Sequence, residues 1–231
     1  MARTRPPDRF AQLLDAGLHV FGERGPAAAR MADVSAAMGV SPGSLYNYVT
    51  GKDALFHWVV EHCGDTTPVI APASLPISAP ADGATGARLR ERLRDAVHAP
   101  ALDAALARRR VRDVATELAE ILGERFDVRW RSRRFARLVK RATLELPERF
   151  QAYARGLERE LHAKLEWYLE RRIARGHLHA DIDPTLAAHL VLDAIARFAD
   201  EPPEGMSRET LRAGLIGQLA HSLVPNGGGR A

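Results

Sequence analysis

The chain of 231 residues has a single cysteine, Cys63, which excludes an intrachain disulfide. It has no run of the ~20 apolar residues needed to cross a bilayer, and its first residues, MARTRPPDRF, lack the apolar stretch of a signal peptide. We therefore expect a protein of the cytoplasm with one or two domains. Cys63 continues the apolar face of Leu55 and Val59, which favours a place in a core over a redox-sensing role.

Signatures of catalysis and metal binding are also missing. The sequence has no Gly-rich phosphate loop, nucleophile elbow or HExxH pattern, so we expect neither an enzyme nor a cofactor. Four side chains alternate as metal ligands can: His177, His179, Asp181 and Asp183. They fall in a turn where polar residues are common, and Asp183 precedes Pro184 as a helix cap does. We expect no metal, with metal binding as the alternative.

Residues 29–56, ARMADVSAAMGVSPGSLYNYVTGKDALF, predict two short helices joined by a turn and followed by a third helix. Met31, Val34 and Met38 share one face of the first helix, which ends at Gly39. Ser41-Pro42 begins the second, because the Ser hydroxyl accepts an orphan backbone N–H and the φ of proline suits the first helical position. The pattern indicates a DNA-reading helix-turn-helix; a plain helical corner is the alternative.

The second helix carries most of the expected DNA contacts. In such motifs it enters the major groove N-terminus first, and its short polar side chains meet base edges or phosphates. Asn47 suits adenine, Lys52 suits a phosphate, and one of the two tyrosines is expected to reach a phosphate while the other braces the core. The predicted contact residues are Arg30, Ser41, Pro42, Gly43, Ser44, Tyr46, Asn47, Tyr48 and Lys52.

From Phe10 to about Cys63 the sequence resembles the TetR family of one-component transcriptional repressors. The resemblance rests on MGVSPGSLYNYV (38–49), on Lys52 and Leu55, and on an apolar stripe in the preceding helix, Phe10, Leu13, Leu14, Gly17, Leu18 and Phe21. It implies an all-α fold, with an N-terminal three-helix bundle that holds the helix-turn-helix and a C-terminal helical domain for ligand binding and dimerisation. The family usually has Ser or Thr where this chain has Ala29 and Arg30, which weakens a helix cap but offers Arg30 to a phosphate. Val49 replaces the usual Phe.

The expected DNA-binding head is not basic. Residues 1–87 carry 6 Lys and Arg against 8 Asp and Glu, whereas residues 88–175 carry 23 against 14 and residues 176–231 carry 4 against 7. DNA affinity must therefore come from the placement of single cations such as Arg30 and Lys52 and from backbone amides. Arg3 and Arg5 suit a minor-groove arm, or belong to a tail without a role.

Prolines follow one another at four-residue intervals through residues 65–86, at Pro68, Pro72, Pro76 and Pro80. This spacing prevents a helix or a central strand and predicts an extended linker or surface loop. We expect its apolar residues, Val69, Ile70, Leu75 and Ile77, to pack on the second domain. A linker of this length is expected to loosen the coupling between ligand and DNA.

The rest of the chain is predicted to be helical. Apolar spacing places helices over Arg88 to His98, Leu102 to Phe126, Ser132 to Leu146 and Pro147 to Arg175, with two more after the caps Asp183 and Ser207. The predicted division is residues 1–64 for DNA binding, 65–86 for the linker, 87–224 for ligand binding and dimerisation, and 225–231 for a disordered tail.

The helices at Leu157 to Arg175 and Pro184 to Phe198 resemble the antiparallel pair through which many TetR proteins dimerise, and the C-terminal helix is a further candidate. Ala187, Ala188, Ala194 and Ala196 are small enough for close helix approach. A two-fold dimer predicts a palindromic operator on double-stranded DNA with half-sites ~34 Å apart. A monomer whose core these residues complete is the alternative.

Family resemblance further implies a small-molecule effector bound by the C-terminal domain. The candidate pocket residues are Phe126, Trp130, Phe135, Tyr153 and Trp167. Arginines at 108–112 and 129–134 suit an anionic ligand such as an acyl-CoA, the DNA-facing side of the dimer, or solvated helix faces. The sequence thus predicts a ligand-responsive repressor; an all-α small-molecule-binding protein or enzyme without specific DNA recognition is the alternative.

Overall fold

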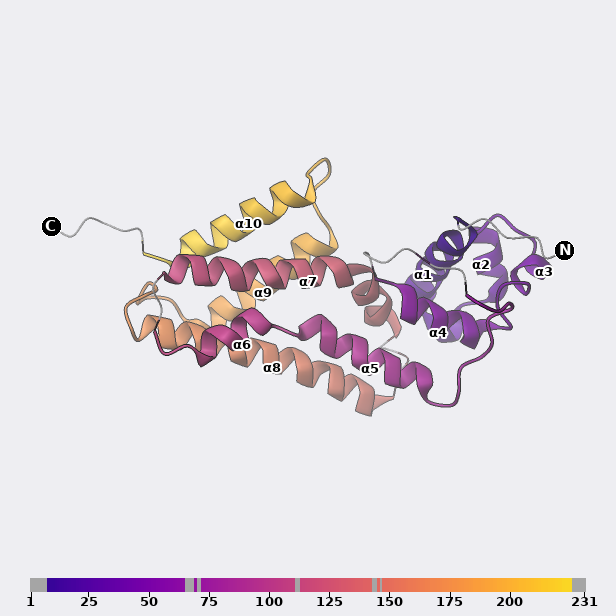
Figure 1. Cartoon of the computed structure of the whole chain (residues 1–231), viewed down its shortest axis with the longest axis horizontal. Coiled ribbons are helices and arrows are strands. Elements are labelled where there is room, and N and C mark those ends of the chain that lie inside the picture. Colours follow the sequence, from indigo (N-terminus) through magenta and orange to yellow (C-terminus); the bar gives the residue numbers. More distant parts are fainter. Residues whose placement is uncertain are drawn as a thin grey trace. The chain divides into compact units, whose positions relative to one another are not determined.

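The computed structural model describes residues 8–64, 69, 72–110, 113–142, 145 and 147–225. Over these residues the chain is all-α, as predicted, and has no strand (Figure 1). The ten helices of the described residues are α1 (Asp8–Ala28), α2 (Met31–Ala37), α3 (Pro42–Leu45), α4 (Lys52–His62), α5 (Ala84–Val97), α6 (Pro100–Ala107), α7 (Val114–Ala142), α8 (Glu148–Ile173), α9 (Pro184–Asp200) and α10 (Arg208–Leu223). Arg3, Arg5, Ile70 and the tail beyond 225 lie outside the described residues. No helix among those described is long and apolar enough to span a membrane.

The chain forms two compact units that do not coincide with the predicted domains. The first unit contains residues 1–93 and 131–154, and the second contains residues 94–130 and 155–231. The helices α5, α7 and α8 each contribute to both. Residues 131–154, which the periodicity assigned to the ligand-binding domain, therefore pack with the helix-turn-helix.

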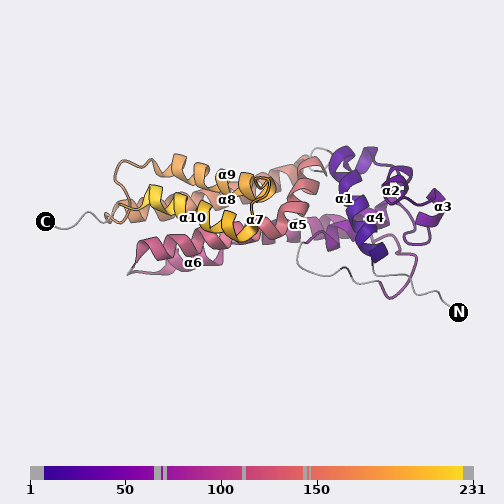
Figure 2. The ribbon, with the colours of Figure 1, turned by 90° about the horizontal axis from the view of Figure 1, so that it is seen from above.

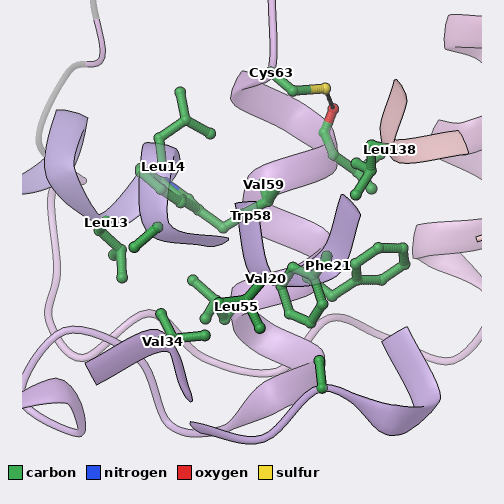
Figure 3. Close-up of a cluster of buried hydrophobic side chains, with 14 of the residues drawn as sticks. Leu13, Leu14, Val20, Phe21, Val34, Leu55, Trp58, Val59, Cys63 and Leu138 are labelled. Carbon is green, nitrogen blue, oxygen red and sulfur yellow. Dashed lines mark hydrogen bonds between the residues drawn. The ribbon is translucent and has the colours of Figure 1, made fainter. Parts of the chain in front are cut away.

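The core of the first unit forms where α1 crosses α4. Leu13 and Phe21 of α1 are fully buried, and Figure 3 shows them with Leu55 and Val59 of α4 in one apolar cluster. A Cβ on Gly17 would lie 2.6 Å from Cγ2 of Val59, so the glycine lets the two helices approach closely. The apolar stripe predicted for the first helix is confirmed.

The C-terminal part of α7 completes this core. Phe135, Leu138 and Ala142 are buried in the same cluster as the helix-turn-helix, and Arg134 pairs with Asp15 of α1. Cys63 is buried beside them, its thiol donates to the carbonyl of Val60, and burial raises its pKa. A protonated, buried thiol packs as an apolar group, in line with the predicted core position.

The second unit packs α6 and α8 to α10 around the N-terminal part of α7. Both ribbon views show α10 lying along α7 and α9 (Figures 1 and 2). Polar contacts fix this arrangement: Arg129 of α7 binds Asp200 at the end of α9, and Arg208 and Arg212 of α10 bind Asp127 of α7. Of the arginines at 129–134, Arg129 is thus paired within the second unit.

A buried ionic cluster lies inside the second unit. The guanidinium of Arg172, 1% exposed, donates from Nε and Nη2 to Oε1 of Glu117 at 2.9 and 2.6 Å. The hydroxyl of Tyr168 donates to the same oxygen at 3.0 Å, and burial raises the pKa of Tyr168 far above its ordinary value, so it remains a donor. Arg172 also donates to the carbonyl of Ala105, which ties α8 to α6.

The prediction of one helix over Leu102 to Phe126 is wrong, because this range contains the end of α6 and the start of α7. α6 ends at Ala107, and α7 begins at Val114 and runs without a break through the predicted gap at 127–131. Oδ1 of Asp113 accepts the backbone N–H groups of Ala115 and Thr116, and so caps the first turn of α7. Apolar spacing alone had merged the segments, whereas the Asp113 cap is the local signal that separates them.

Candidate nucleic-acid interface

The helix-turn-helix has the predicted local geometry. Val34 and Ser35 of α2 are buried against the core, and α2 ends before Gly39. Oγ of Ser41 accepts the backbone N–H of Ser44 at 3.2 Å, with Pro42 at the first helical position. The predicted helix start is confirmed, since Ser41 caps the helix and Pro42 is its first residue. Arg30 is the N-cap of α2, and its backbone N–H donates to Asp33.

One side of α3 and of the turn that follows it is buried, and the other side faces solvent. Leu45 and Val49 are fully buried, while Tyr46 is 50% exposed. The remaining predicted contact side chains on this side are exposed or half-buried: Ser41, Pro42, Gly43, Ser44 and Asn47. A Cβ on Gly43 would meet no atom within 4 Å, so the protein itself leaves this position open. The segment therefore presents a small, polar surface that suits a groove.

Tyr48 does not belong to that surface. It is 9% exposed and packs edge-on against Phe10, with ring centroids 5.8 Å apart. We predicted Tyr48 as a contact residue, and we also expected one of the two tyrosines to brace the core. Burial of its ring assigns the bracing role to Tyr48 and leaves Tyr46 as the outward tyrosine.

The junction between α1 and α2 is held from two sides at Ala27. The ammonium of Lys52 donates to the carbonyl of Ala27 at 2.8 Å, and the backbone N–H of Ala27 donates to Glu145 at 2.8 Å. Gly25, with φ +78°, bends the chain here, and a Cβ on it would overlap the Glu145 carboxylate. Lys52 is therefore both a structural clamp and a half-exposed cation, since an ammonium has three donors.

The described part of the Pro-rich segment is attached to the head. The N–H of Ile77 donates to the carbonyl of Tyr48 at 2.7 Å, and the N–H of Thr50 donates to the carbonyl of Ile77 at 2.9 Å. Val69 and Ile77 pack against the core of the first unit. Ile77 is thus bound to the helix-turn-helix, contrary to the expectation that it packs on the second domain, and Leu75 is exposed.

Substitution of Ile77 tests whether this attachment positions α3. Ile77→Pro removes the N–H that binds Tyr48, and we expect operator affinity to fall about tenfold and the free energy of unfolding to fall by about 1 kcal/mol. Ala79→Pro, two residues on in the same exposed segment, is the matched control and should change neither. Equal affinity of both variants in an anisotropy titration would show that the attachment does not position α3.

The five predicted pocket aromatics do not form one pocket. Phe126 is buried and stacks on Trp130 at 5.6 Å in the second unit, whereas Phe135 is buried in the core of the first unit. Tyr153 lines a surface groove, and Trp167 is 51% exposed beneath the guanidinium of Arg171. Aromatic identity alone did not distinguish core from pocket, so this set is corrected to two core sites, one groove and one surface position.

Both α8 and α9 expose large apolar side chains. Leu186 and Leu190 of α9 are 58% and 60% exposed, and Trp167 of α8 lies on the exposed side of its helix. The two helices meet where Thr185 donates to Glu166 and where His162 and His189 lie ring to ring at 4.3 Å. Ala187 and Ala188 are buried and face the core of their own chain. Two of the four small residues that were expected to permit close approach of a partner helix therefore serve the core, whereas Ala194 and Ala196 are half-buried.

Of the alternating residues at 177–183, Asp183 caps a helix. Asp183 accepts the N–H of Leu186 at 2.7 Å and caps α9 as predicted, and the backbone N–H of His179 donates to the carbonyl of Leu223. Within the described ranges, no group of three or more His, Cys, Asp or Glu side chains is arranged to hold a metal ion.

Comparisons with known proteins agree with this architecture. The family model "Bacterial regulatory proteins, tetR family" matches residues 13–59, which span α1 to α4. No curated protein matches the chain.

Several solved structures have the same fold. The ketosteroid transcriptional regulator KstR2 of Mycobacterium tuberculosis is 15% identical, with a TM-score of 0.55, over 98% of this chain and 100% of that one. SCO3833 of Streptomyces coelicolor A3, a TetR-family member, is 22% identical, with a TM-score of 0.52, over 100% of this chain and 94% of that one. AibR, solved with isovaleryl coenzyme A and operator DNA, is 14% identical, with a TM-score of 0.51, over 91% of this chain and 97% of that one.

At these identities the structures establish the fold, and the family model identifies the N-terminal domain. The matched residues are the ones whose geometry forms the capped, outward-facing α3. Residues 13–59 are therefore similar to the DNA-binding domain of the tetR family of bacterial regulatory proteins, and the chain has the fold of solved TetR-family transcriptional regulators.

Proposed function

We propose that the protein is a homodimeric repressor in the cytoplasm that a small molecule releases from a palindromic operator. The observation that carries this proposal is the outward side of α3, where Tyr46 is half exposed and Gly43 is open while Leu45 and Val49 are buried. A helix held this way offers its N-terminal residues to base edges in the major groove. The proposed contact set is Arg30, Ser41, Pro42, Gly43, Ser44, Tyr46, Asn47 and Lys52.

The exposed apolar side chains on α8 and α9 support the dimer. Side chains of the size of Leu186 and Leu190 at about 60% exposure are expected to be covered by a partner. The partner that we propose is a second copy of this chain. A two-fold axis between the copies would present two α3 segments to the two half-sites of the proposed palindromic operator.

The fold supports a ligand-responsive regulator. AibR was solved with both isovaleryl coenzyme A and operator DNA, so a regulator with this fold binds both. We extend to this chain the function of ligand-controlled DNA binding, and expect its effector to shift a population between DNA-binding and released forms. An all-α ligand-binding protein or enzyme without specific DNA recognition is the competing function.

The proposal is tested by an anisotropy titration of the DNA upstream of the protein's own gene, over a salt series and with nonspecific competitor. We expect competitor-resistant binding at two or four chains per site, with an affinity that falls as salt rises. Weak binding that does not discriminate between sequences would contradict the proposal for this DNA.

Two substitutions test the proposed contact set, and Lys52→Ala also removes the hydrogen bond to the carbonyl of Ala27. We expect Tyr46→Ala and Lys52→Ala each to lower operator affinity about ten- to hundredfold, because each removes an outward group of the proposed contact set. Lys140→Ala is the matched control for the lost charge, since Lys140 is exposed on α7 outside the contact set. Unchanged affinity of both variants, with native circular dichroism, would contradict the assignment of α3.

A further inference from the structure

A groove of about 440 Å³ opens within the first unit, between the start of α5 and the start of α8. Its walls are Gly83, Gly86 and Arg90 on one side and Pro147, Arg149, Phe150 and Tyr153 on the other. The volume lies in the range typical of small-molecule sites. This groove is separate from the aromatic cluster of Phe126 and Trp130 in the second unit.

The groove combines apolar walls with two available cations. Pro147, Phe150 and Tyr153 supply the apolar lining. Arg88 and Arg92, on the same helix as Arg90, are engaged by Glu91 and by the carbonyl of Glu61. By contrast, neither Arg90 nor Arg149 has an ion-pair or hydrogen-bond partner within the part of the chain that the structure describes. Two guanidinium groups beside an apolar surface complement an anion with an apolar body.

We propose that this groove binds a carboxylic acid with an apolar chain, whose carboxylate is held by Arg90 and Arg149. The planar guanidinium offers paired N–H donors that match the two oxygens of a carboxylate. The chain of the ligand would lie against Phe150 and Tyr153 and remove apolar surface from water.

Residues close in sequence to both walls of the groove contact the helix-turn-helix. Ile77, which binds Tyr48 and Thr50, precedes Gly83 by six residues, and Glu145, which binds Ala27, precedes Pro147 by two. A ligand that changes the spacing of the walls therefore acts on both ends of the DNA-reading segment. The effect on DNA rests on the proposed function, whereas ligand binding by the groove does not.

Isothermal titration calorimetry with dodecanoate, below its micelle-forming concentration and without DNA, tests the site. We expect one dodecanoate per chain, and no saturable binding of dodecyltrimethylammonium, which has the same chain and the opposite charge. Arg90→Gln with Arg149→Gln should weaken dodecanoate binding about ten- to hundredfold. The matched control, Arg94→Gln with Arg155→Gln, removes two exposed arginines from the same two helices and should stay within twofold of the parent.

A second variant fills the groove. A Cβ on Gly86 would meet only Nη1 of Arg90, at 3.8 Å, so Gly86→Phe is expected to fold and to abolish dodecanoate binding. Absence of saturable binding by the parent, or equal binding by the arginine variant and its control, would overturn the proposal.

The coupling to DNA is measured separately by anisotropy. Dodecanoate should lower the operator affinity of the parent at least tenfold and leave that of Gly86→Phe unchanged. If the parent binds dodecanoate in the groove but binds no operator, the site stands and the proposed function fails. If it binds operator but not dodecanoate, the proposed function is supported and the proposed carboxylate site in the groove is contradicted.

Discussion

A variant that carries Leu186→Arg and Leu190→Arg is expected to be monomeric and to bind a palindromic operator about 10²- to 10⁴-fold more weakly than the parent. Both leucines are more than half exposed on α9. In a two-fold contact, each substitution meets its own copy or a close neighbour, so four arginines would come together where four apolar side chains are expected to meet. Loss of the dimer converts two linked half-site contacts into independent ones.

Light scattering at micromolar protein measures the first effect, and an anisotropy titration measures the second. Met206→Arg is the matched control, because Met206 is an exposed apolar residue, 43% accessible, between α9 and α10. It should remain dimeric and keep its operator affinity. A dimer that persists in the double variant would move the interface elsewhere, with α10 as the next candidate.

The largest loss of stability is expected from Arg172→Met. The substitution leaves the Glu117 carboxylate, 4% exposed, without the guanidinium that donates to it twice. A buried charge that loses its partner destabilises a fold by about 3–5 kcal/mol. Urea unfolding at a fixed protein concentration measures this change, since dimerisation makes the midpoint depend on concentration.

The double variant Glu117→Met with Arg172→Met separates loss of an ion pair from loss of packing. Replacement of both charges by apolar groups of similar size removes the carboxylate that would otherwise keep only the exposed Arg108, at 3.6 Å, as an ionic partner, so we expect it to recover at least half of the stability that Arg172→Met loses. If the single variant is within about 1 kcal/mol of the parent, the ionic cluster does not hold α8 against α6 and α7.

Local signals in the sequence predicted the parts of the fold that local chemistry determines. The caps at Ser41, Asp183 and Ser207 each accept a backbone N–H three residues on, as their sequence context predicted. The same reasoning, applied to Asp113, would have divided α6 from α7. Apolar spacing located the helices, but it did not tell which core each helix enters, so Phe135 and Leu138 were assigned to the wrong unit.

The contacts that hold the candidate site in place have no local signature. Ile77 binds Tyr48 and Thr50 through backbone groups, which any residue except proline offers. Glu145 reaches Ala27 across 118 residues. The groove likewise joins the starts of two helices that are far apart in sequence. The sequence therefore predicted which of residues 41–47 are exposed more completely than what holds this segment in place.

The account depends on the claim that α3 of a dimer reads a specific duplex, and selection from a random DNA pool tests this most directly because it assumes no target. The account predicts enrichment of an inverted repeat whose half-site centres are about 10 base pairs apart, or a multiple of that, and loss of the enriched sequence with Tyr46→Ala. A pool that remains unenriched after repeated rounds, with dimeric and folded protein, would contradict it.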